Sequence, residues 1–273
     1  MSLRRHIRHL RNRLFALLVV AVLLLLAEWV AAVRDGHRPS SFLVRGIADG
    51  REVWTENQFF TARFASPRVA SPPPPVSALR ARPENSLRVC VLADSTALGL
   101  GTSGPAFSLS RQLEAILAAR LPSRKCEVIL LSAPSANSHI LREIADDLSK
   151  LSPDAVVFAC ANDEFTGPYG PASALGGFHH SSRIARGLVL LSRTHLSRAL
   201  GSALERWFPD DVDRAIWSGR EPVMMKGLLP DSSPAVATAR RSYERNVRAI
   251  LRSARRAAPF VLACSTPVNL RGC

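Results

Sequence analysis

Residues that could perform acyl-transfer chemistry occur at three places in the chain, each directly after an apolar run. Asp94 and Ser95 follow the first run, Ser135 lies just after the second, and Asn162 follows the third. A serine hydroxyl can attack an acyl carbon, while an asparagine amide and backbone N–H groups can bind the oxyanion that develops. If the three places meet in the folded protein, these residue types predict a serine nucleophile with an oxyanion hole.

The elements that would bring these residues together are parallel strands. From residue 86 onwards, short apolar runs alternate with patterns of helical periodicity, which predicts strands alternating with helices. Parallel sheets collect their reactive groups at the carboxyl ends of the strands. We therefore expect an α/β fold, specifically a three-layer α/β/α arrangement around a parallel sheet. The expected strands are 86–93, 126–133, 154–160 and 258–268, and the expected helices are 105–121, 138–151 with Ser138 as its cap, pieces of 173–208, and 235–257.

Each candidate residue also has a purely structural interpretation. On spacing alone, Ser95 is more simply the first residue of a turn after a strand. The Asn162 block favours the nucleophile instead, because a second strand end then supplies the amide that the chemistry requires. The acidic pair Asp163 and Glu164 could cap a helix or, with further ligands, hold a metal ion. No histidine or third carboxylate stands at ligand spacing from them, so we expect neither a metal nor a cofactor.

An apolar run of 20 residues, 14–33, precedes these segments and carries one charge, Glu28. A helix of this length extends roughly 30 Å, which is the thickness of a bilayer's hydrocarbon core. Five arginines precede the run, and positive residues stay on the cytoplasmic side. We therefore expect a single-pass anchor in the inner (cytoplasmic) membrane, with the N-terminus cytoplasmic and the following domain periplasmic. A signal peptide cleaved near Val30-Ala31-Ala32 is the alternative.

The chain divides into four expected regions. Residues 1–13 form a basic cytoplasmic tail, 14–33 the transmembrane anchor, 34–85 a juxtamembrane segment and Pro-rich linker, and 86–273 the α/β domain. The linker contains the run SPPPPVS at 71–77, which cannot continue a helix or a central strand and therefore predicts a stiff, extended spacer. The short apolar pieces within 34–68 fit at most a short hairpin.

Charge and cysteine content bound the partners and the redox state. The formal net charge is +14, but the arginines crowd the first thirteen residues or scatter along the expected helices, and no zinc-ligand spacing or RNA-binding aromatic motif accompanies them. We therefore expect no nucleic-acid partner. Of the five cysteines, Cys90, Cys160 and Cys264 lie in or beside apolar runs and are interpreted as buried free thiols, with a disulfide left open.

The order of the three polar blocks resembles the SGNH (GDSL-type) hydrolases. Ala93-Asp94-Ser95, then PSANSH at 134–139, then CANDEFTGPYG at 160–170 is similar in particular to a membrane-anchored bacterial branch with the pattern N-N-E-x-x-G-P-Y-G. The likeness extends over most of 86–273, including the closing STPVNLRGC. By position the resemblance implies that Ser95 is the nucleophile and that its backbone N–H is one oxyanion donor. It implies Asn162 as the side-chain oxyanion donor and Ser135 as a further N–H donor. Asp94 would orient the turn that carries the nucleophile, and the pocket wall would consist of Glu164 and Gly167-Pro168-Tyr169-Gly170.

The sequence departs from that family in three ways. Ala93 replaces the first glycine, so we expect an altered or strained turn, and the middle glycine is absent near Ser135. No Asp-x-x-His, the block that carries the family's base, occurs in the 273 residues. We expect a chain that is incomplete at its C-terminus, with a pseudoenzyme as the alternative. Among the histidines present, His139 is the nearest candidate base by topology, although a polar lining or capping role fits it better.

These expectations combine into two hypotheses of different class. The first is an exported, membrane-tethered serine esterase of the SGNH type that acts on small-molecule, lipid or glycan esters through Ser95 and an oxyanion hole at Asn162. An O-acyltransferase acting on glycans would use the same site. The second is a catalytically inactive domain of the same fold that binds a glycan or another partner in its crevice. The membrane is a partner in both hypotheses, through residues 14–33.

Overall fold

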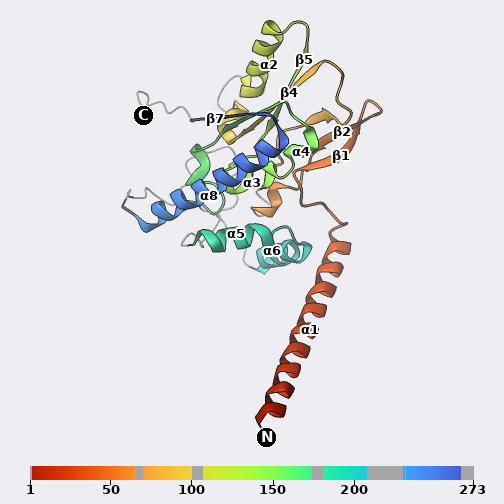
Figure 1. Ribbon diagram of the computed structural model, residues 1–273, viewed down its shortest axis with the longest axis vertical. Helices are drawn as coiled ribbons and strands as arrows, with labels where there is room; N and C mark the ends of the chain where they lie inside the picture. Colours follow the sequence, from red (N-terminus) through yellow and green to blue (C-terminus); the bar gives the residue numbers. More distant parts are fainter. Residues whose placement is uncertain are drawn as a thin grey trace.

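A parallel sheet of four strands organises the chain from residue 86 onwards (Figure 1). The computed structural model describes residues 2–65, 70–99, 107–173, 181–207, 230 and 232–265. The strands of the sheet are β4 (Ser86–Ala93), β5 (Lys125–Leu131), β6 (Ala155–Ala159) and β7 (Phe260–Cys264), in the spatial order β5-β4-β6-β7. Because β4 pairs with β5 on one side and with β6 on the other, the strand order reverses between β4 and β6. Open parallel sheets bind their ligands beyond the carboxyl ends of the strands at such a reversal.

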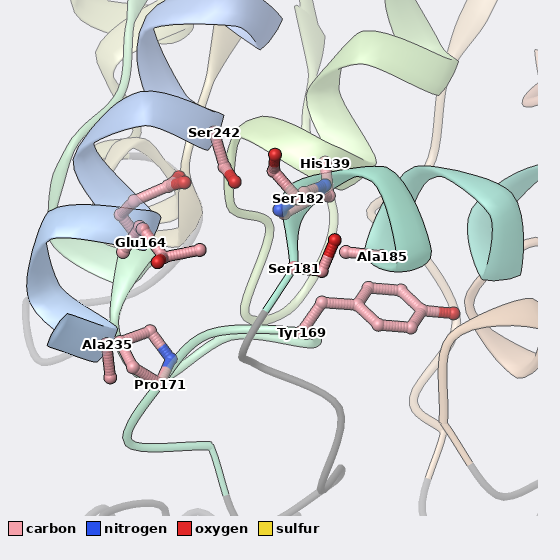
Figure 2. Close-up of a pocket in the computed structure, with 11 residues that line it drawn as sticks. His139, Glu164, Tyr169, Pro171, Ser181, Ser182, Ala185, Ala235 and Ser242 are labelled. Carbon is pink, nitrogen blue, oxygen red and sulfur yellow. The ribbon is translucent and has the colours of Figure 1, made fainter.

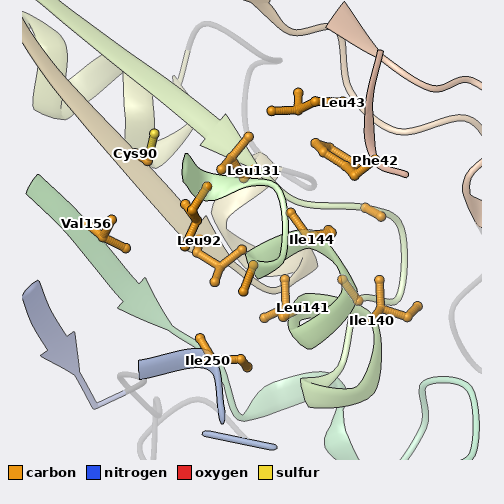
Figure 3. Close-up of a cluster of buried hydrophobic side chains, with 14 of the residues drawn as sticks. Phe42, Leu43, Cys90, Leu92, Leu131, Ile140, Leu141, Ile144, Val156 and Ile250 are labelled. Atoms are coloured by element: carbon orange, nitrogen blue, oxygen red, sulfur yellow. The ribbon is translucent and has the colours of Figure 1, made fainter. Parts of the chain in front are cut away.

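Helices cover both faces of this sheet, as the alternating pattern predicted (Figure 1). They are α2 (Leu109–Arg120) on one face and α3 (Ser138–Ala145), α4 (Leu148–Leu151) and α8 (Pro234–Ala257) on the other. Successive residues of a strand point to opposite faces, so Val91 of β4 packs with α2 while Cys90 and Leu92 pack with the other three helices. Figure 3 shows Ile144 of α3 and Ile250 of α8 in the same cluster as Leu92. The predicted α/β class with a parallel sheet is therefore confirmed.

A second, antiparallel sheet precedes β4 and consists, in spatial order, of β1 (Leu43–Ala48), β2 (Arg51–Glu56) and β3 (Ser77–Leu79). Strands β1 and β2 form a hairpin, and Asp49 and Gly50 at its turn both have positive φ, +49° and +71°, as a type I′ turn requires. Phe42 and Phe60 are fully buried in the same cluster as the helices of the parallel sheet. The region 34–85, in which the sequence predicted a linker, therefore packs against the domain through buried aromatic rings.

The N-terminal helix α1 (Ser2–Arg34) extends away from the rest of the molecule (Figure 1). Its stretch Arg11–Arg34 is long and apolar enough to cross a membrane, and no other helix in the described ranges meets that test. The end of α1 contacts α6 (His195–Trp207), which follows α5 (Ser182–Leu191). The Glu28 carboxylate accepts the backbone N–H groups of His195 and Leu196, each at 2.8 Å. A carboxylate at a helix N-terminus is stabilising, so this contact holds α1 to the domain.

The four cysteines within the described residues are free thiols. Cys90 and Cys160 are buried, as predicted, and burial raises the pKa of both thiols, that of Cys90 to about 12. Thiols in such surroundings are inert. The prediction that Cys264 is buried was wrong: this residue is exposed at the end of β7, which lies at the edge of the sheet.

Candidate active site

Ser95 and Asn162, the two residues expected to carry the chemistry, lie at the same edge of the parallel sheet. Ser95 begins the short helix η2 (Ser95–Leu98) just after β4, and Asn162 begins η4 (Asn162–Glu164) just after β6. Strands β4 and β6 are adjacent and parallel, and they pair as far as Ala93 and Ala159. Their carboxyl ends therefore place both residues where the strand order reverses, the usual location of a ligand site in this type of sheet.

Asp94 joins the two strand ends through its carboxylate. Oδ2 accepts the backbone N–H groups of Ala161 and Asn162 at 3.0 and 3.1 Å, and Oδ1 accepts both the N–H and the hydroxyl of Thr96. Asp94 is only 1% exposed, so the accepting carboxylate is shielded from water, while the residues that donate to it lie at the surface. The side chain thus fixes the turn that carries Ser95 together with the turn that carries Asn162.

The hydroxyl and the backbone N–H of Ser95 both point at one carboxylate oxygen. Asp163 Oδ2 accepts the hydroxyl at 2.5 Å and the N–H at 3.2 Å. The N–H that the resemblance assigns to an oxyanion hole is therefore occupied by a charged oxygen in this conformation. From the sequence, Asp163 was expected only as a cap or a metal ligand. Its position directly after Asn162 places it at the same strand end, but the sequence carries no signal that its side chain turns toward Ser95.

Asn162 has an exposed side chain beside Ser95. Its Nδ2 donates to Thr96 Oγ1 at 3.4 Å, a long contact that leaves most of the amide's hydrogen-bonding capacity to solvent. Because Thr96 directly follows Ser95, this contact brings the amide next to the candidate nucleophile. The structure therefore brings together Asp94, Ser95 and Asn162 of the residues expected at the site.

Ser135, the remaining candidate, lies in the turn after β5 and has a positive φ of +52°. That conformation favours glycine, the residue which the resemblance places here, and it costs a serine about 1 kcal/mol. The turn reaches the site through Ser132, whose hydroxyl donates to the Asp94 carbonyl at 3.2 Å. The turn also lies close to Gly167, where a Cβ would be 2.7 Å from the Ser135 carbonyl oxygen. Ala93, by contrast, is the last residue of the extended strand β4 and does not have a positive φ. The backbone at this position therefore does not require a glycine.

Helix α3 begins after Asn137, so the predicted cap at Ser138 was wrong. Asn137 Oδ1 accepts N–H groups in the first turn of α3, including that of His139 at 3.2 Å. Its Nδ2 donates to the Pro168 carbonyl at 2.6 Å. One buried side chain therefore both caps the helix and holds the loop 167–170 against it.

Ser138 is instead the centre of a buried polar network. Glu164, the last residue of η4, accepts the Ser138 N–H and hydroxyl, each at 2.9 Å. Asn246 of α8 donates to the same hydroxyl at 3.0 Å and lies 3.2 Å from His139 Nδ1. The network joins the segment after β6 to α3 and α8, and it fixes the position of the Glu164 side chain.

A hollow of about 10 Å³, enough for one water molecule, lies beside this network. Figure 2 shows Glu164, His139 and Ser242 among the side chains around it. The His139 ring packs edge-on against Tyr169, with ring centroids 5.8 Å apart. His139 therefore lines the hollow and contacts Asn246 of α8. The Ser95 hydroxyl, for which His139 was a candidate base, is bonded to Asp163 instead.

Burial shifts the pKa values of two groups in this network in the direction that favours their neutral forms. Burial raises the pKa of Glu164 to about 7, against the opposing effect of its hydrogen bonds from Ser138. Burial lowers the pKa of His139 to about 4, and the positive charges of Arg186 and Arg142 add to this effect. At a pH between these two values, the folded protein keeps a protonated carboxyl and a neutral imidazole beside the hollow.

Replacing Glu164 by glutamine should change how stability depends on pH. An acid whose pKa is raised by folding stabilises fully below its unfolded pKa of about 4.3, and this contribution is lost as the pH rises through about 7. The free-energy advantage of the wild type over Glu164→Gln should therefore fall by on the order of 2–3 kcal/mol between about pH 4.5 and 8. The lowered pKa of His139 makes the free energy of unfolding rise with pH, but it does so in both proteins and therefore cancels in the difference between them. Urea unfolding of both proteins in detergent measures the difference between their free energies of unfolding at each pH. A difference that does not change with pH would contradict the raised pKa of Glu164.

No family model, curated protein or solved structure matches the chain. The closing segment 266–273, on which part of the family resemblance rests, lies outside the residues that the structure describes, and so do two further histidines, His179 and His180. Within the described ranges, no three His, Cys, Asp or Glu side chains gather closely enough to hold a metal ion. A functional assignment therefore rests on the geometry at the carboxyl edge of the sheet.

Proposed function

We propose that this protein is a membrane-tethered serine esterase with the three-layer α/β/α fold of the SGNH type. The observation that carries the proposal is the position of Ser95 and Asn162 at the ends of the adjacent strands β4 and β6, joined by the buried carboxylate of Asp94. A nucleophile and a side-chain oxyanion donor thus come from distant parts of the sequence to one sheet edge, which is the arrangement that acyl transfer requires. The substrate would be a small-molecule, lipid or glycan ester.

In the proposed reaction, Ser95 Oγ attacks the acyl carbon and its proton passes to a base. The carbonyl oxygen becomes an oxyanion, which Asn162 Nδ2 and the Ser95 N–H bind. Asp163 Oδ2 accepts both Ser95 donors, so it stands where that oxygen would lie, and substrate must displace it. The resemblance implies a histidine as the base. The tetrahedral intermediate then collapses: its bond to the ester's alcohol oxygen breaks, and the protonated base gives its proton to that oxygen as the alcohol leaves. Water, losing its proton to the same base, then attacks the acyl group and releases it from Ser95, or a sugar hydroxyl takes it in the O-acyltransferase version of the reaction.

We further propose that α1 crosses the inner membrane, with its N-terminus in the cytoplasm and the domain on the periplasmic side. The apolar stretch within Arg11–Arg34 and the arginines that precede it support this orientation. The bonds from His195 and Leu196 to Glu28 hold α6 beside the end of α1. Exposed leucines on α5 and α6, namely Leu190, Leu191 and Leu200, fit a position of these two helices at the membrane surface.

A catalytically inactive domain that binds a glycan or another partner at this sheet edge is the second candidate function. One observation favours it: a carboxylate, and not an imidazole, holds the Ser95 hydroxyl at 2.5 Å. Carboxylates are as a class weaker bases than imidazole, and a serine without an effective base reacts as a simple alcohol. Turnover of an ester distinguishes the two functions.

Hydrolysis of a short-chain nitrophenyl ester by the full-length protein in detergent tests the proposal. Asn162→Ala should lower kcat by about 10²–10³-fold with KM little changed, because the lost donor acts on the oxyanion of the transition state. Gln58→Ala, which removes another exposed carboxamide, is the matched control and should leave kcat unchanged. A wild-type protein without turnover would favour the second candidate, and an Asn162→Ala variant as active as the wild type would refute the oxyanion role.

A further inference from the structure

A groove with a volume of about 350 Å³ lies between α3, α5 and α8, and this volume is in the range of small-ligand pockets. Its described lining includes none of Asp94, Ser95 and Asn162. Four arginines contribute to it: Arg142 of α3, Arg183 and Arg186 of α5, and Arg245 of α8. These helices come from distant parts of the sequence, so only the folded protein brings the four positive charges to one place.

The carboxylates around the groove do not balance this charge. Among the described residues that line it, none is acidic. Arg186 pairs with Glu143 at 2.7 Å, but Glu143 also pairs with Arg63 at 2.6 Å and with Arg193 at 2.7 Å. Arg193 also pairs with Asp146 at 2.6 Å, so two negative charges face these three arginines. The groove keeps an excess of positive charge after these ion pairs are counted.

Arg142 shows the same imbalance from the α3 side. Its guanidinium is half-buried, and Nη1 donates to the neutral amide of Asn246 at 3.2 Å. Burial lowers the pKa of Arg142, and the nearby charge of Arg186 lowers it further, against the opposing effect of the Asp146 and Glu143 carboxylates. A guanidinium in such surroundings is stabilised by an anion that binds it, and such charge-assisted hydrogen bonds are about twice as strong as neutral ones.

Small hydroxyl groups complete one end of the groove. Ser182, at the start of α5, and Ser242 of α8 line both the groove and the neighbouring hollow, and Figure 2 shows them beside His139. Hydroxyls donate hydrogen bonds to anionic oxygens without adding charge. The lining therefore combines several guanidinium groups with neutral hydrogen-bond donors.

We propose that this groove binds a phosphate group, carried either by a lipid headgroup or by a soluble phosphate compound. Phosphate fits it better than a single carboxylate does, because its several oxygens can accept from more than one guanidinium at once. Leu190 also lines the groove and is exposed, so an acyl chain attached to the phosphate would meet an apolar surface there. The inference is independent of the chemistry proposed for Ser95.

The experiment compares phosphate binding by the full-length wild type with that of two double variants, all in uncharged detergent. Arg183→Gln with Arg245→Gln removes two exposed arginines from the groove. Arg248→Gln with Arg255→Gln removes two exposed arginines from other positions on α8 and serves as the charge-matched control. Calorimetric titration has one arm with inorganic phosphate and one with dihexanoyl phosphatidylglycerol, for which dihexanoylglycerol is the phosphate-free control.

The wild type should bind at least one of the two phosphate probes, and the groove variant should bind it at least about tenfold more weakly. The control variant should bind within about twofold of the wild type, because its arginines lie outside the groove. Binding of inorganic phosphate identifies a soluble ligand class, and binding of the phospholipid alone identifies a headgroup. The proposal is overturned if the wild type binds neither probe, if the groove variant binds like the wild type, or if both double variants weaken equally.

Discussion

Replacing Ser95 by alanine is expected to abolish ester hydrolysis, lowering kcat by at least about 10³-fold, because the hydroxyl is the atom that would form the acyl-enzyme. The variant should remain folded. Ser95 is half-buried, and the substitution removes the hydroxyl bond to Asp163 while the backbone N–H that donates to the same carboxylate stays in place. We expect a stability change within about 1 kcal/mol. Steady-state hydrolysis and thermal unfolding of the full-length protein in detergent measure the two effects together.

Ser123→Ala is the matched control for this experiment. Ser123 is exposed and lies in the turn before β5, at the amino end of the strands, whereas Ser95 lies at the carboxyl end. Removing its hydroxyl should change neither the rate nor the stability. A Ser95→Ala protein that hydrolyses the ester as fast as the wild type would remove Ser95 from the mechanism.

Replacing Asp94 by alanine is expected to have the largest effect on stability, a loss of about 3–5 kcal/mol. The substitution leaves the N–H groups of Thr96, Ala161 and Asn162 without their acceptor at a position that is 1% exposed. A donor left without its partner costs up to about 1–3 kcal/mol, and neighbouring losses do not add fully. Because the same bonds position Asn162, hydrolysis should be lost as well. Denaturant unfolding monitored by circular dichroism measures the change.

Two further substitutions separate the role of the Asp94 carboxylate from a general effect of charge. Asp94→Asn keeps the shape but places an NH₂ group among donors, so it should cost less than the alanine variant, about 1–3 kcal/mol. Glu84→Ala removes an exposed carboxylate and should change stability by no more than about 0.5 kcal/mol. An Asp94→Ala protein as stable as Glu84→Ala would show that the two strand ends are held together by other contacts.

The sequence predicted most of the parallel sheet because its strands are short apolar runs with clear ends. The run 86–93 was predicted with the same limits that β4 has, since polar residues bound it on both sides. The neighbourhood of Ser95 and Asn162 followed from one rule, that adjacent parallel strands deliver the residues after them to one edge. Periodicity and this rule together were sufficient for the geometry of the two strand ends.

Other features depend on contacts between side chains that periodicity does not encode. The region 34–85 was predicted as a juxtamembrane segment with at most a short hairpin, together with a Pro-rich linker, yet Phe42 and Phe60 are buried in the main cluster. Asp163 was not predicted as the partner of the Ser95 hydroxyl, because nothing in the spacing tells which of two adjacent side chains turns toward a neighbouring strand. The arginine groove assembles from three helices, so its charge could be recognised only after the helices were placed.

The most direct test of the account is the structure of the full-length protein after reaction with an alkyl fluorophosphonate, whose adduct mimics the tetrahedral intermediate. The account predicts phosphorus bonded to Ser95 Oγ, with the phosphonyl oxygen within hydrogen-bond distance of Asn162 Nδ2 and the Ser95 N–H, and the Asp163 carboxylate displaced from the position it now holds. An unmodified Ser95, or an adduct whose phosphonyl oxygen points away from Asn162, would contradict it.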